Sequence, residues 1–352
     1  MRKLQLLVAL AAVCAFLAAN ASGRPIVEPS GPVVMSGLDN PRHLEFGPEG
    51  ALYVAEAGRG GSGPCIFIRG ETQCAGSTGA VSRLWHGVQS RVVMGLPSYA
   101  GASGNGATGP HGISLHGRGN AYVTVGLGGE AMPPSAFRAA MGQGFGRTVR
   151  FKPTGAWSYE DDLGGYEEAN NPDTGPVDSN PYGILAGPGG RYVIDSGGND
   201  LLRVRSNGAV STVAVFESRP QGRSTDSVPT SVALGPDGNY YVGELTGGPF
   251  PVGAARVYRV VGGTPTVYCS GFTAIIDITW GPDGQLYVLQ FATGPGLTGP
   301  GILYRVAADC AKTPVATDLI VPGGVTFGPD GAIYISNKSV LAGAGEVLRF
   351  DP

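Results

Sequence analysis

A chain of 352 residues with only 14% charged side chains and a formal net charge of −3 has no basic cluster for nucleic acid and little charge for electrostatic steering of partners. Glycine supplies 60 residues and proline 28, a share that indicates disorder unless it is periodic. Here the excess falls at regularly spaced turns, so we expect a turn-rich β protein with a large core.

The first 21 residues have the three parts of a secretory signal peptide. Arg2 and Lys3 form the basic start, an apolar run extends from Leu4 to Ala19, and Ala19-Asn20-Ala21 is a small-residue cleavage site. The alternative, a membrane anchor, needs about 20 apolar residues, and this run is shorter. We therefore expect cleavage, no membrane span in the mature chain, and an extracellular protein, or a periplasmic one if the source is a bacterium. Residues 22–32 are then a short N-terminal extension.

Six copies of one pattern run through the rest of the chain. Each copy has an apolar strand, a tight turn containing glycine, and a second strand in which Tyr is followed by Val or Ile. The intervals between these Tyr residues settle near 47, with two near 70 where insertions enter, and a period of this length suits one four-stranded propeller blade. The sequence thus predicts a single all-β domain, a six-bladed β-propeller over residues 33–352. The Tyr residues are Tyr53, Tyr122, Tyr192, Tyr241, Tyr287 and Tyr334.

The two ends of the chain are predicted to complete one blade. The chain stops after a third strand, Glu346–Phe350, and it begins, after the signal, with Pro32–Leu38, which resembles the fourth strand of the first repeat, Arg91–Leu96. We expect the N-terminal strand to close the last blade, which joins the ring and protects its edges. The repeated Tyr residues, and an Arg on each third strand, are expected to be structural. These Arg residues are Arg83, Arg150, Arg203, Arg259, Arg305 and Arg349.

Five cysteines are present, and Cys14 leaves with the signal. The remaining four are an even number in an oxidising compartment and allow three pairings. We favour Cys65 with Cys74, which staples one loop, and Cys269 with Cys310, which ties neighbouring repeats. Free buried thiols are the alternative. No His stands at zinc spacing from either pair, which argues against a structural zinc.

The long insertions are expected on one face of the ring. In a propeller the turns between first and second strands share one face, whereas the loops after the Tyr strands and before the inner strands share the other. All the insertions fall on this second, loop-rich face, and loops on a rigid scaffold commonly carry function. They span residues 57–79, residues 127–146 with an expected short helix at Ser135–Met141, and residues 156–180 with the acidic run Tyr159–Asp162.

A polar side chain stands three residues after the Tyr in five of the six repeats: Glu56, Asp195, Glu244, Gln290 and Asn337. Acids and amides supply the oxygen ligands that Ca²⁺ prefers, and this ion takes six to eight of them. Ca²⁺ at the central channel is therefore the cofactor that the pattern suggests, with Glu56, Asn180, Asp195 and Glu244 as candidate ligands. The alternative, which we favour, is that these side chains cap blade turns by hydrogen bonding to the backbone.

A second polar group lies at the starts of the inner strands and at the loop-rich rim, and several of its members are expected to converge on the central opening. The candidate ligand-binding residues are Arg42, Tyr182, Asn199 and Asp277.

Two histidines are weak catalytic candidates. His43 and His111 begin adjacent inner strands, so either is a candidate general base, with Arg42 beside His43. The alternative is that they are satisfied polar residues of a channel. His86 and His116 are expected in exposed turns. The sequence lacks a Gly-x-Ser-x-Gly elbow, a phosphate-binding loop and a dinucleotide fingerprint.

Segments between the blade turns resemble the ScyD/ScyE family, and the repeat Asn180–Ile184 resembles those of NHL-type propellers. The likeness spans essentially residues 33–352. It implies an exported propeller from a family named after the gene cluster for scytonemin, a cyanobacterial sunscreen pigment, and it implies no catalytic residues. The segments that carry it are Gly37–Arg42, Leu52–Gly58, Gly95–Ser98, Asn171–Asp173, Asp178–Gly183, Gly197–Val204, Val228–Val232, Gly243–Gly247 and Gly271–Thr273.

These observations favour a monomeric secreted module that binds a small molecule or an extracellular protein on its loop-rich face. Two alternatives stay open. One is a metal-dependent propeller enzyme of the lactonase or quinone-dependent sugar dehydrogenase type, which rests on fold-level analogy. The other is an accessory role in extracytoplasmic synthesis of a pigment or another secondary metabolite.

Overall fold

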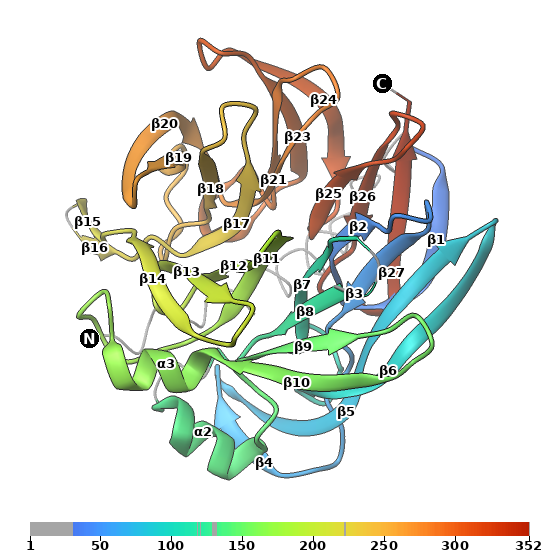
Figure 1. The fold of residues 1–352 in the computed structure, drawn as a ribbon, viewed down its shortest axis with the longest axis vertical. Coiled ribbons are helices and arrows are strands. Elements are labelled where there is room, and N and C mark those ends of the chain that lie inside the picture. Colours follow the sequence, from blue (N-terminus) through green and yellow to red (C-terminus); the bar gives the residue numbers. More distant parts are fainter. Residues whose placement is uncertain (1–30, 118, 120, 129–131, 222, 352) are drawn as a thin grey trace.

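Six antiparallel sheets surround a central axis in the computed structural model (Figure 1). The structure describes residues 31–351 apart from residues 118, 120, 129–131 and 222, so the predicted signal peptide lies outside the described residues. Each sheet runs outward from an inner strand at the axis. The fold is the six-bladed β-propeller that the repeats predict.

The first three blades carry the helices. Blade 1 consists of β2 (Pro41–Phe46), β3 (Leu52–Glu56), β5 (Glu71–Trp85) and β6 (Val88–Ala100), with β4 (Cys65–Ile68) paired to β5. Blade 2 consists of β7 (Pro110–Leu115), β8 (Ala121–Val125), β9 (Arg147–Phe151) and β10 (Trp157–Asp162), with α2 (Pro134–Met141) before β9. Helix α3 (Leu163–Asn170) leads to blade 3, which consists of β11 (Pro181–Gly187), β12 (Gly190–Asp195), β13 (Asp200–Arg205) and β14 (Val210–Val215).

The last three blades follow the same order. A short hairpin, β15 (Arg219–Gln221) and β16 (Arg223–Thr225), precedes blade 4, which consists of β17 (Pro229–Leu234), β18 (Tyr240–Glu244), β19 (Ala255–Val261) and β20 (Thr264–Phe272). Blade 5 consists of β21 (Ile275–Trp280), β22 (Leu286–Gln290), the 3₁₀ turn η1 (Pro295–Leu297), β23 (Gly301–Val306) and β24 (Lys312–Leu319). Blade 6 consists of β25 (Gly324–Phe327), β26 (Ile333–Asn337), β27 (Ala342–Phe350) and β1 (Val33–Asp39).

The repeated Tyr and Arg residues are cross-strand partners in all six blades. In blade 5, Arg305 Nε donates to Asp283 Oδ2 over 2.6 Å, and the hydroxyl of Tyr287 donates to the same oxygen over 3.3 Å. Asp283 belongs to the turn between β21 and β22, where Gly284 takes a φ of 71°, a left-handed conformation that glycine adopts without strain. The same contact of Tyr and Arg with the Asp of the turn recurs in blades 4 and 6, through Asp237 and Asp330, so in these three blades the pair ties the turn to the strands.

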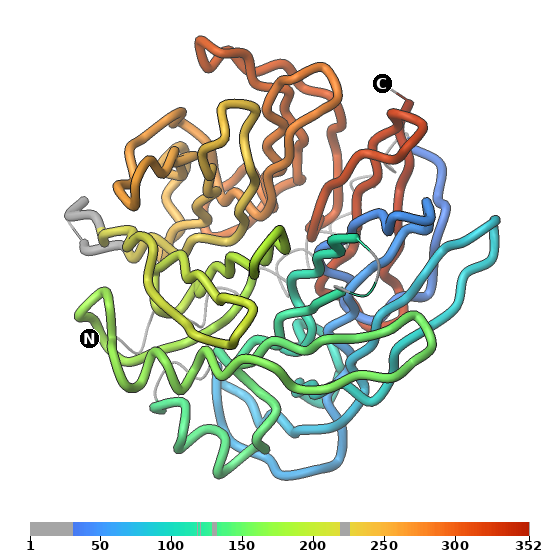
Figure 2. Tube along the Cα trace, viewed as in Figure 1, coloured from blue at the N-terminus to red at the C-terminus, as the bar shows by residue number. Residues whose placement is uncertain are grey.

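The N-terminal strand closes the ring, as predicted. Strand β1 pairs antiparallel with β27, and Figure 2 shows the blue start of the described chain beside its red end. Met35 and Leu38 point into the core with 1% and 0% of their surface exposed. The covered edge of β27 is thereby removed from solvent.

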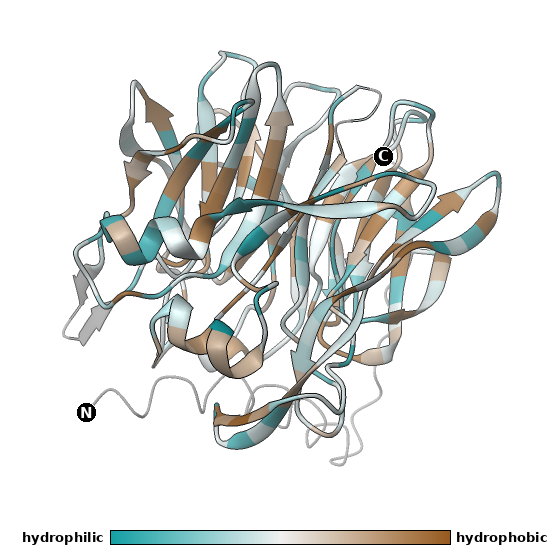
Figure 3. Ribbon diagram, turned by 60° about the horizontal axis from the view of Figure 1, so that its bottom comes forward, coloured by the Kyte–Doolittle hydropathy of each residue, from teal (hydrophilic) through white to brown (hydrophobic). Residues whose placement is uncertain are grey.

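Apolar side chains fill the spaces between the blades. Figure 3 shows hydrophobic residues concentrated in the strands, with more polar connections around them. The largest buried cluster joins blades 1 and 2 to helix α2 and includes Tyr53, Tyr99 and Phe137. Within the described part of the chain, no helix has the length and apolar character that crossing a membrane requires.

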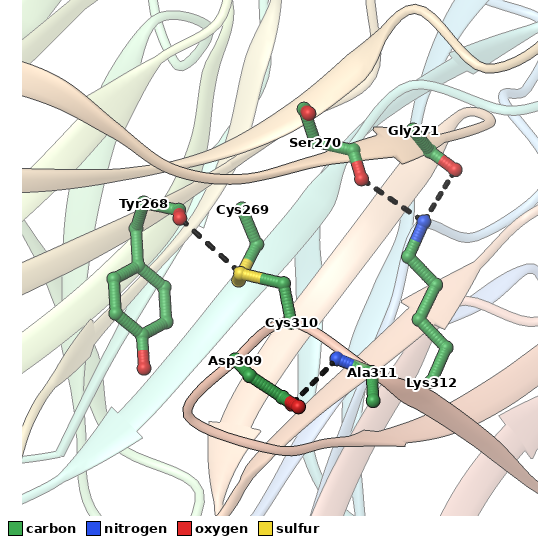
Figure 4. The surroundings of a disulfide bond; sticks show 8 residues. All are labelled: Tyr268, Cys269, Ser270, Gly271, Asp309, Cys310, Ala311 and Lys312. Carbon is green, nitrogen blue, oxygen red and sulfur yellow. Dashed lines mark hydrogen bonds between the residues drawn. A yellow bond between two sulfur atoms is a disulfide. The ribbon is translucent and has the colours of Figure 1, made fainter.

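Both expected disulfides are present. Cys65 and Cys74 join β4 to β5, and Cys269 of β20 is bonded to Cys310 in the turn before β24 (Figure 4). The first bond staples one hairpin, and the second ties blade 4 to blade 5. Two disulfides are compatible with an extracellular or periplasmic protein.

Loss of the second disulfide should cost more stability than loss of the first. The bridged residues are 41 positions apart for Cys269–Cys310 and 9 for Cys65–Cys74. Because a longer closed loop restricts the unfolded chain more, replacing both cysteines by serine should cost about 1 kcal/mol more at the Cys269–Cys310 pair. Urea unfolding of the two double variants measures this difference. Equal losses would contradict the loop-length argument.

One sequence expectation about the insertions was wrong. The acidic run Tyr159–Asp162 is part of β10, the outer strand of blade 2, rather than of a loop, and the next residues of this insertion form helix α3. The strand accommodates Asp161 because the carboxylate of this residue accepts hydrogen bonds from Thr148 Oγ1 on the neighbouring β9 and from Arg191 of blade 3. The helix expected at Ser135–Met141 is confirmed as α2.

Candidate functional site

The central channel contains a cavity of about 270 Å³. All six inner strands contribute to its wall, which mixes polar residues such as His43, Ser114 and Asp277 with apolar ones such as Ile184 and Val232. Ligand sites in proteins are commonly concave, largely apolar spaces with a few placed polar groups, and this cavity lies just below their usual size range. It therefore suits a small ligand.

Five side chains gather at the loop-face end of this channel, and we call them the axial cluster: Arg42, His43, Arg69, His111 and Tyr182. Tyr182 is the common neighbour. Its ring centroid lies 5.4 Å from that of His43 and 4.6 Å from that of His111. The inner strands of blades 1, 2 and 3 begin here, so residues from three blades meet because each blade starts its inner strand at the axis.

Arg69 reaches the axial cluster from the insertion of blade 1. It occupies the tight turn between β4 and β5 with Gly70, and both residues have positive φ, 55° and 84°. Two such residues form the turn type that suits a two-residue hairpin. Arg69 Nη2 donates to the carbonyl of Gly128 over 2.9 Å, and its guanidinium lies 5.8 Å from the ring of Tyr99. The Cys65–Cys74 disulfide holds this hairpin together.

The axial cluster carries more positive than negative charge. Burial lowers the pKa of Arg42; Tyr182 acts against this effect, and Arg69 adds to it. Burial, Arg42 and His43 hold the pKa of His111 well below its ordinary value, so its imidazole is neutral near pH 7. Asp277 lies next to His43 but already accepts from the backbone amides of Ile278 and Val325. An anion would offset the repulsion among the basic groups.

Three buried nitrogens of the axial cluster have no hydrogen-bond partner among the described residues. They are Arg42 Nε, His43 Nε2 and His111 Nδ1. The other nitrogens of Arg42 are engaged, because Nη1 donates to the carbonyl of Ser339 and Nη2 to that of Ala107. An unsatisfied buried polar group costs roughly 1–3 kcal/mol, so a ligand or water that bonds to these nitrogens is favoured.

Side chains of one inner strand cap the exposed edge of the next. Leu115 N donates to Glu45 Oε2 over 2.8 Å, Ala186 N donates to Ser114 Oγ over 3.0 Å, and Val325 N donates to Asp277 Oδ2 over 2.8 Å. These bonds satisfy backbone groups that an inner edge strand would otherwise leave unpaired. Asp277 therefore has a structural role whatever else it does.

The channel should make stability depend on pH through Glu45. Burial, partly offset by hydrogen bonds from Leu115 and Ser114, raises the pKa of this carboxyl to about 7. Because the folded chain holds the proton more tightly than the unfolded chain, stability falls as pH rises through 7. Glu45→Gln should be close to neutral at pH 5 and stabilising by about 1–2 kcal/mol at pH 8, allowing for screening in the channel. Urea unfolding at both pH values measures this, and equal effects would contradict it.

The structure does not bring the predicted Ca²⁺ ligands together. Glu56, Asp195 and Glu244 belong to three different blades, and each is bonded within its own surroundings. Among the described residues, no three His, Cys, Asp or Glu side chains form a group placed to hold a metal ion. Asn180 lies nearer the axis and accepts from Leu127 N over 3.2 Å.

The polar column after the Tyr residues caps the loops that enter the inner strands. Glu56 Oε2 accepts from Asp39 N, Asp195 Oδ1 from Asn180 N, and Gln290 Oε1 from Thr273 N, at 2.6, 2.6 and 2.9 Å. Asn337 Oδ1 accepts in the same way from Ile320 N over 2.8 Å. Backbone capping, the alternative favoured from the sequence, accounts for these four members of the column, whereas Glu244 accepts from the hydroxyls of Ser227 and Tyr258.

The candidate ligand residues divide into two groups. Arg42, Tyr182 and Asp277 meet at the axis with the two histidines, as expected. Asn199 lies apart, because its side chain accepts from Val228 N and donates to Asp173. Sequence reasoning missed Arg69. The feature that could have indicated its hairpin is the Arg69-Gly70 pair between two short segments rich in β-forming residues.

No family model matches this sequence, and no curated protein sequence is significantly similar to it. Solved structures do resemble it. A protein of unknown function from Bacteroides thetaiotaomicron has a TM-score of 0.56 at 9% identity, covering 94% of this chain and 74% of that one. A putative oxidoreductase (glucose dehydrogenase) from Thermus thermophilus has a TM-score of 0.53 at 17% identity, covering 91% of this chain and 99% of that one.

A calcium-binding protein, regucalcin, from Agrobacterium tumefaciens is also similar, with a TM-score of 0.52 at 13% identity, covering 91% of this chain and 93% of that one. All three structures are below 25% identical to this chain. What they share with it is the propeller fold.

Proposed function

We propose that this chain is an exported propeller that binds a small anionic ligand, a carboxylate or a phosphate, at the axial cluster. The observation that carries the proposal is the gathering of Arg42 and two histidines around Tyr182, where Arg69 acts on Arg42 and His111 and three buried nitrogens have no partner among the described residues. Arginine bonds to carboxylate and phosphate with charge-assisted hydrogen bonds, which are the strong ones. The cavity below supplies room for the rest of a small ligand.

Export is part of this proposal. Its support is the signal-like sequence of residues 1–21, the two disulfides and the resemblance to the exported ScyD/ScyE propellers. The same resemblance makes extracytoplasmic synthesis of a secondary metabolite one setting in which such a module could act.

A second candidate is an acid–base enzyme at the same place. One observation favours it: His111 has a neutral imidazole whose Nδ1 is unpartnered among the described residues, as a general base requires. The metal-dependent lactonase and sugar dehydrogenase types have less support, because each predicted acidic ligand is hydrogen-bonded in its own surroundings and no three acidic, histidine or cysteine side chains among the described residues form a metal-binding group. Turnover of a bound ligand, lost in His111→Ala, would establish the enzyme.

Thermal shift and calorimetric titration with a panel of small carboxylates, phosphates and sulfates, each matched with a neutral analogue, test the binding proposal. At least one anion should stabilise the protein while its neutral analogue does not. Arg42→Gln and Arg69→Gln should each weaken binding tenfold or more, which is about 1.4 kcal/mol. Arg205→Gln, on the exposed end of β13, is the matched control and should bind normally. Anion binding that survives both test substitutions, or no binding at all, would overturn the proposal.

A further inference from the structure

Five carboxylates crowd together on the loop face of blade 3, away from the axial cluster. We call them the blade 3 acid cluster: Glu167, Asp173, Asp178, Asp195 and Asp200. They come from helix α3, from the loop that joins α3 to β11, and from the two strands β12 and β13. Helix α3 (Figure 1) packs on this blade through Leu163 and Tyr166.

Two of these acids are direct cross-strand partners. Asp195 of β12 is paired with Asp200 of β13, on either side of the turn 196–199. Like charges placed opposite each other in a sheet are destabilising. Glu167 adds a third charge, since its Oε2 lies 2.9 Å, and Asp195 Cγ 3.6 Å, from the point where a Cβ on Gly198 would stand. The chain thus brings three negative groups to one small space.

The hydrogen bonds satisfy one of these acids and leave two with free oxygens. Asp195 accepts from Ser179 Oγ and from three backbone amides, those of Asn180, Gly197 and Gly198. Asp200 is only 1% exposed, yet neither of its oxygens has a partner among the described residues. Glu167 is 2% exposed, and its Oε1 is also without one. Asp178 Oδ1 and the amide oxygen of Asn171 are two further unpartnered acceptors of this region.

Little positive charge compensates this group. Arg69 acts on Asp178, whereas the charged neighbours that act most strongly on Glu167 and Asp200 are other carboxylates of the cluster. Burial and these neighbours raise the pKa of Glu167 to about 8, and burial followed by Asp195 raises that of Asp178 to about 6. A buried carboxylate without a partner costs several kcal/mol, so without a cation it takes up a proton, and a bound cation would supply the counter-charge in place of that proton.

We propose that the blade 3 acid cluster binds a hard divalent cation, Ca²⁺, through both oxygens of Asp200 and through Glu167 Oε1, which have no hydrogen-bond partner among the described residues. Carboxylate and amide oxygens on irregular loops are the donors that Ca²⁺ takes in proteins, and its coordination tolerates irregular geometry. No three acidic, histidine or cysteine side chains converge on one point among the described residues. The cation therefore draws the two free carboxylates together and completes its shell with carbonyl oxygens, such as that of Asn171, and water. This site shares no residue with the axial cluster, and the two are linked through Arg69, which acts on Asp178.

Melting of the purified protein in Ca²⁺ and in chelator, for the wild type and for Asp200→Asn, tests the proposal. Saturating Ca²⁺ should raise the melting temperature of the wild type by at least about 3 °C. Asp200→Asn removes one buried negative charge without changing the shape of the side chain. In chelator this variant should melt no lower than the wild type, and Ca²⁺ should no longer stabilise it, so the wild type should melt higher than the variant only in Ca²⁺.

Glu167→Gln should also lose the rise in melting temperature that Ca²⁺ causes. This variant provides the test if Asp200→Asn does not fold. Glu160→Gln, which makes the same charge change at an exposed position of β10, is the control and should keep the full Ca²⁺ response. Calorimetric titration with CaCl₂ should give one site in the wild type and none in Asp200→Asn. The proposal is overturned if millimolar Ca²⁺ leaves the wild type unchanged, or if Asp200→Asn and Glu167→Gln keep its response.

Discussion

Removal of residues 32–38 lowers the melting temperature by more than 10 °C or prevents folding altogether. The segment supplies most of β1, the strand that closes blade 6 against β27. Met35 and Leu38 are buried in the cluster between blades 6 and 1, and deleting a buried side chain of this size costs about 3–5 kcal/mol each. The whole protein is stable by only about 5–15 kcal/mol, so two such losses and an open edge strand use up most of it.

Point variants separate the closure from a mere effect of chain length. Leu38→Ala should cost about 3 kcal/mol on its own, because Leu38 is fully buried. Val33→Ala, on the same strand but with 52% of its surface exposed, should leave the melting curve nearly unchanged. Thermal unfolding followed by circular dichroism measures both. If the truncated chain melts with the wild type, β1 does not close the ring.

Glu56→Ala destabilises the protein by about 3 kcal/mol, equally with Ca²⁺ and with chelator. Glu56 is 0% exposed, and its two oxygens accept from Ser82 Oγ at 2.6 Å, from Asp39 N at 2.6 Å and from Arg91 at 2.7 and 3.0 Å. Since Asp39 ends the closing strand β1, this carboxylate joins the two ends of the ring. Removing one partner of a buried ion pair costs about 3–5 kcal/mol. Because Arg91 is partly exposed and can be solvated after the substitution, we expect a loss of stability at the lower end of this range.

Urea unfolding in both buffers measures this effect. Asp283→Asn, which breaks a similar pair in an exposed turn, is the control and should change stability little. A loss that appears only in the presence of Ca²⁺ would make Glu56 a metal ligand, as the sequence alone allowed, and would contradict the capping role. A double-mutant cycle with Arg91→Gln gives the interaction free energy of the Glu56–Arg91 pair itself.

The sequence was sufficient to predict the architecture because the same local sequence pattern recurs in each blade. The glycine of each turn, the Tyr that follows it and the Arg of the third strand recur, and in the structure these Tyr and Arg residues are cross-strand partners in every blade. The likeness of Pro32–Leu38 to Arg91–Leu96 gave the closure, and the spacing of the cysteines gave both disulfides. All of these are local signals that hold wherever the blade stands in the ring.

The site was only partly predictable because it depends on contacts between blades. Arg42, His43, His111 and Tyr182 were placed together because every inner strand starts at the axis. Arg69 was missed, since nothing local shows that its hairpin folds toward the axis.

The members of the blade 3 acid cluster were not brought together from the sequence. Asp195 was grouped with acids of other blades on the basis of the repeat, whereas its neighbours Glu167 and Asp200 come from an insertion and from the next strand. The acidic run Tyr159–Asp162 resembles a loop in sequence because it has three charges. Asp161 is nevertheless buried, and it accepts hydrogen bonds from residues on two other strands.

Nuclear magnetic resonance of the histidine side chains tests the central claim, anion binding at the axis, most directly. The chain has four histidines. His43 and His111 belong to the axial cluster. His86 follows β5 and His116 follows β7, and both are exposed, so they serve as internal controls. Titration with phosphate, citrate and acetate at constant ionic strength should shift the ring signals of His43 and His111 and leave the other two in place. Signals that all stay fixed, or that move only at His86 and His116, would contradict the proposed site.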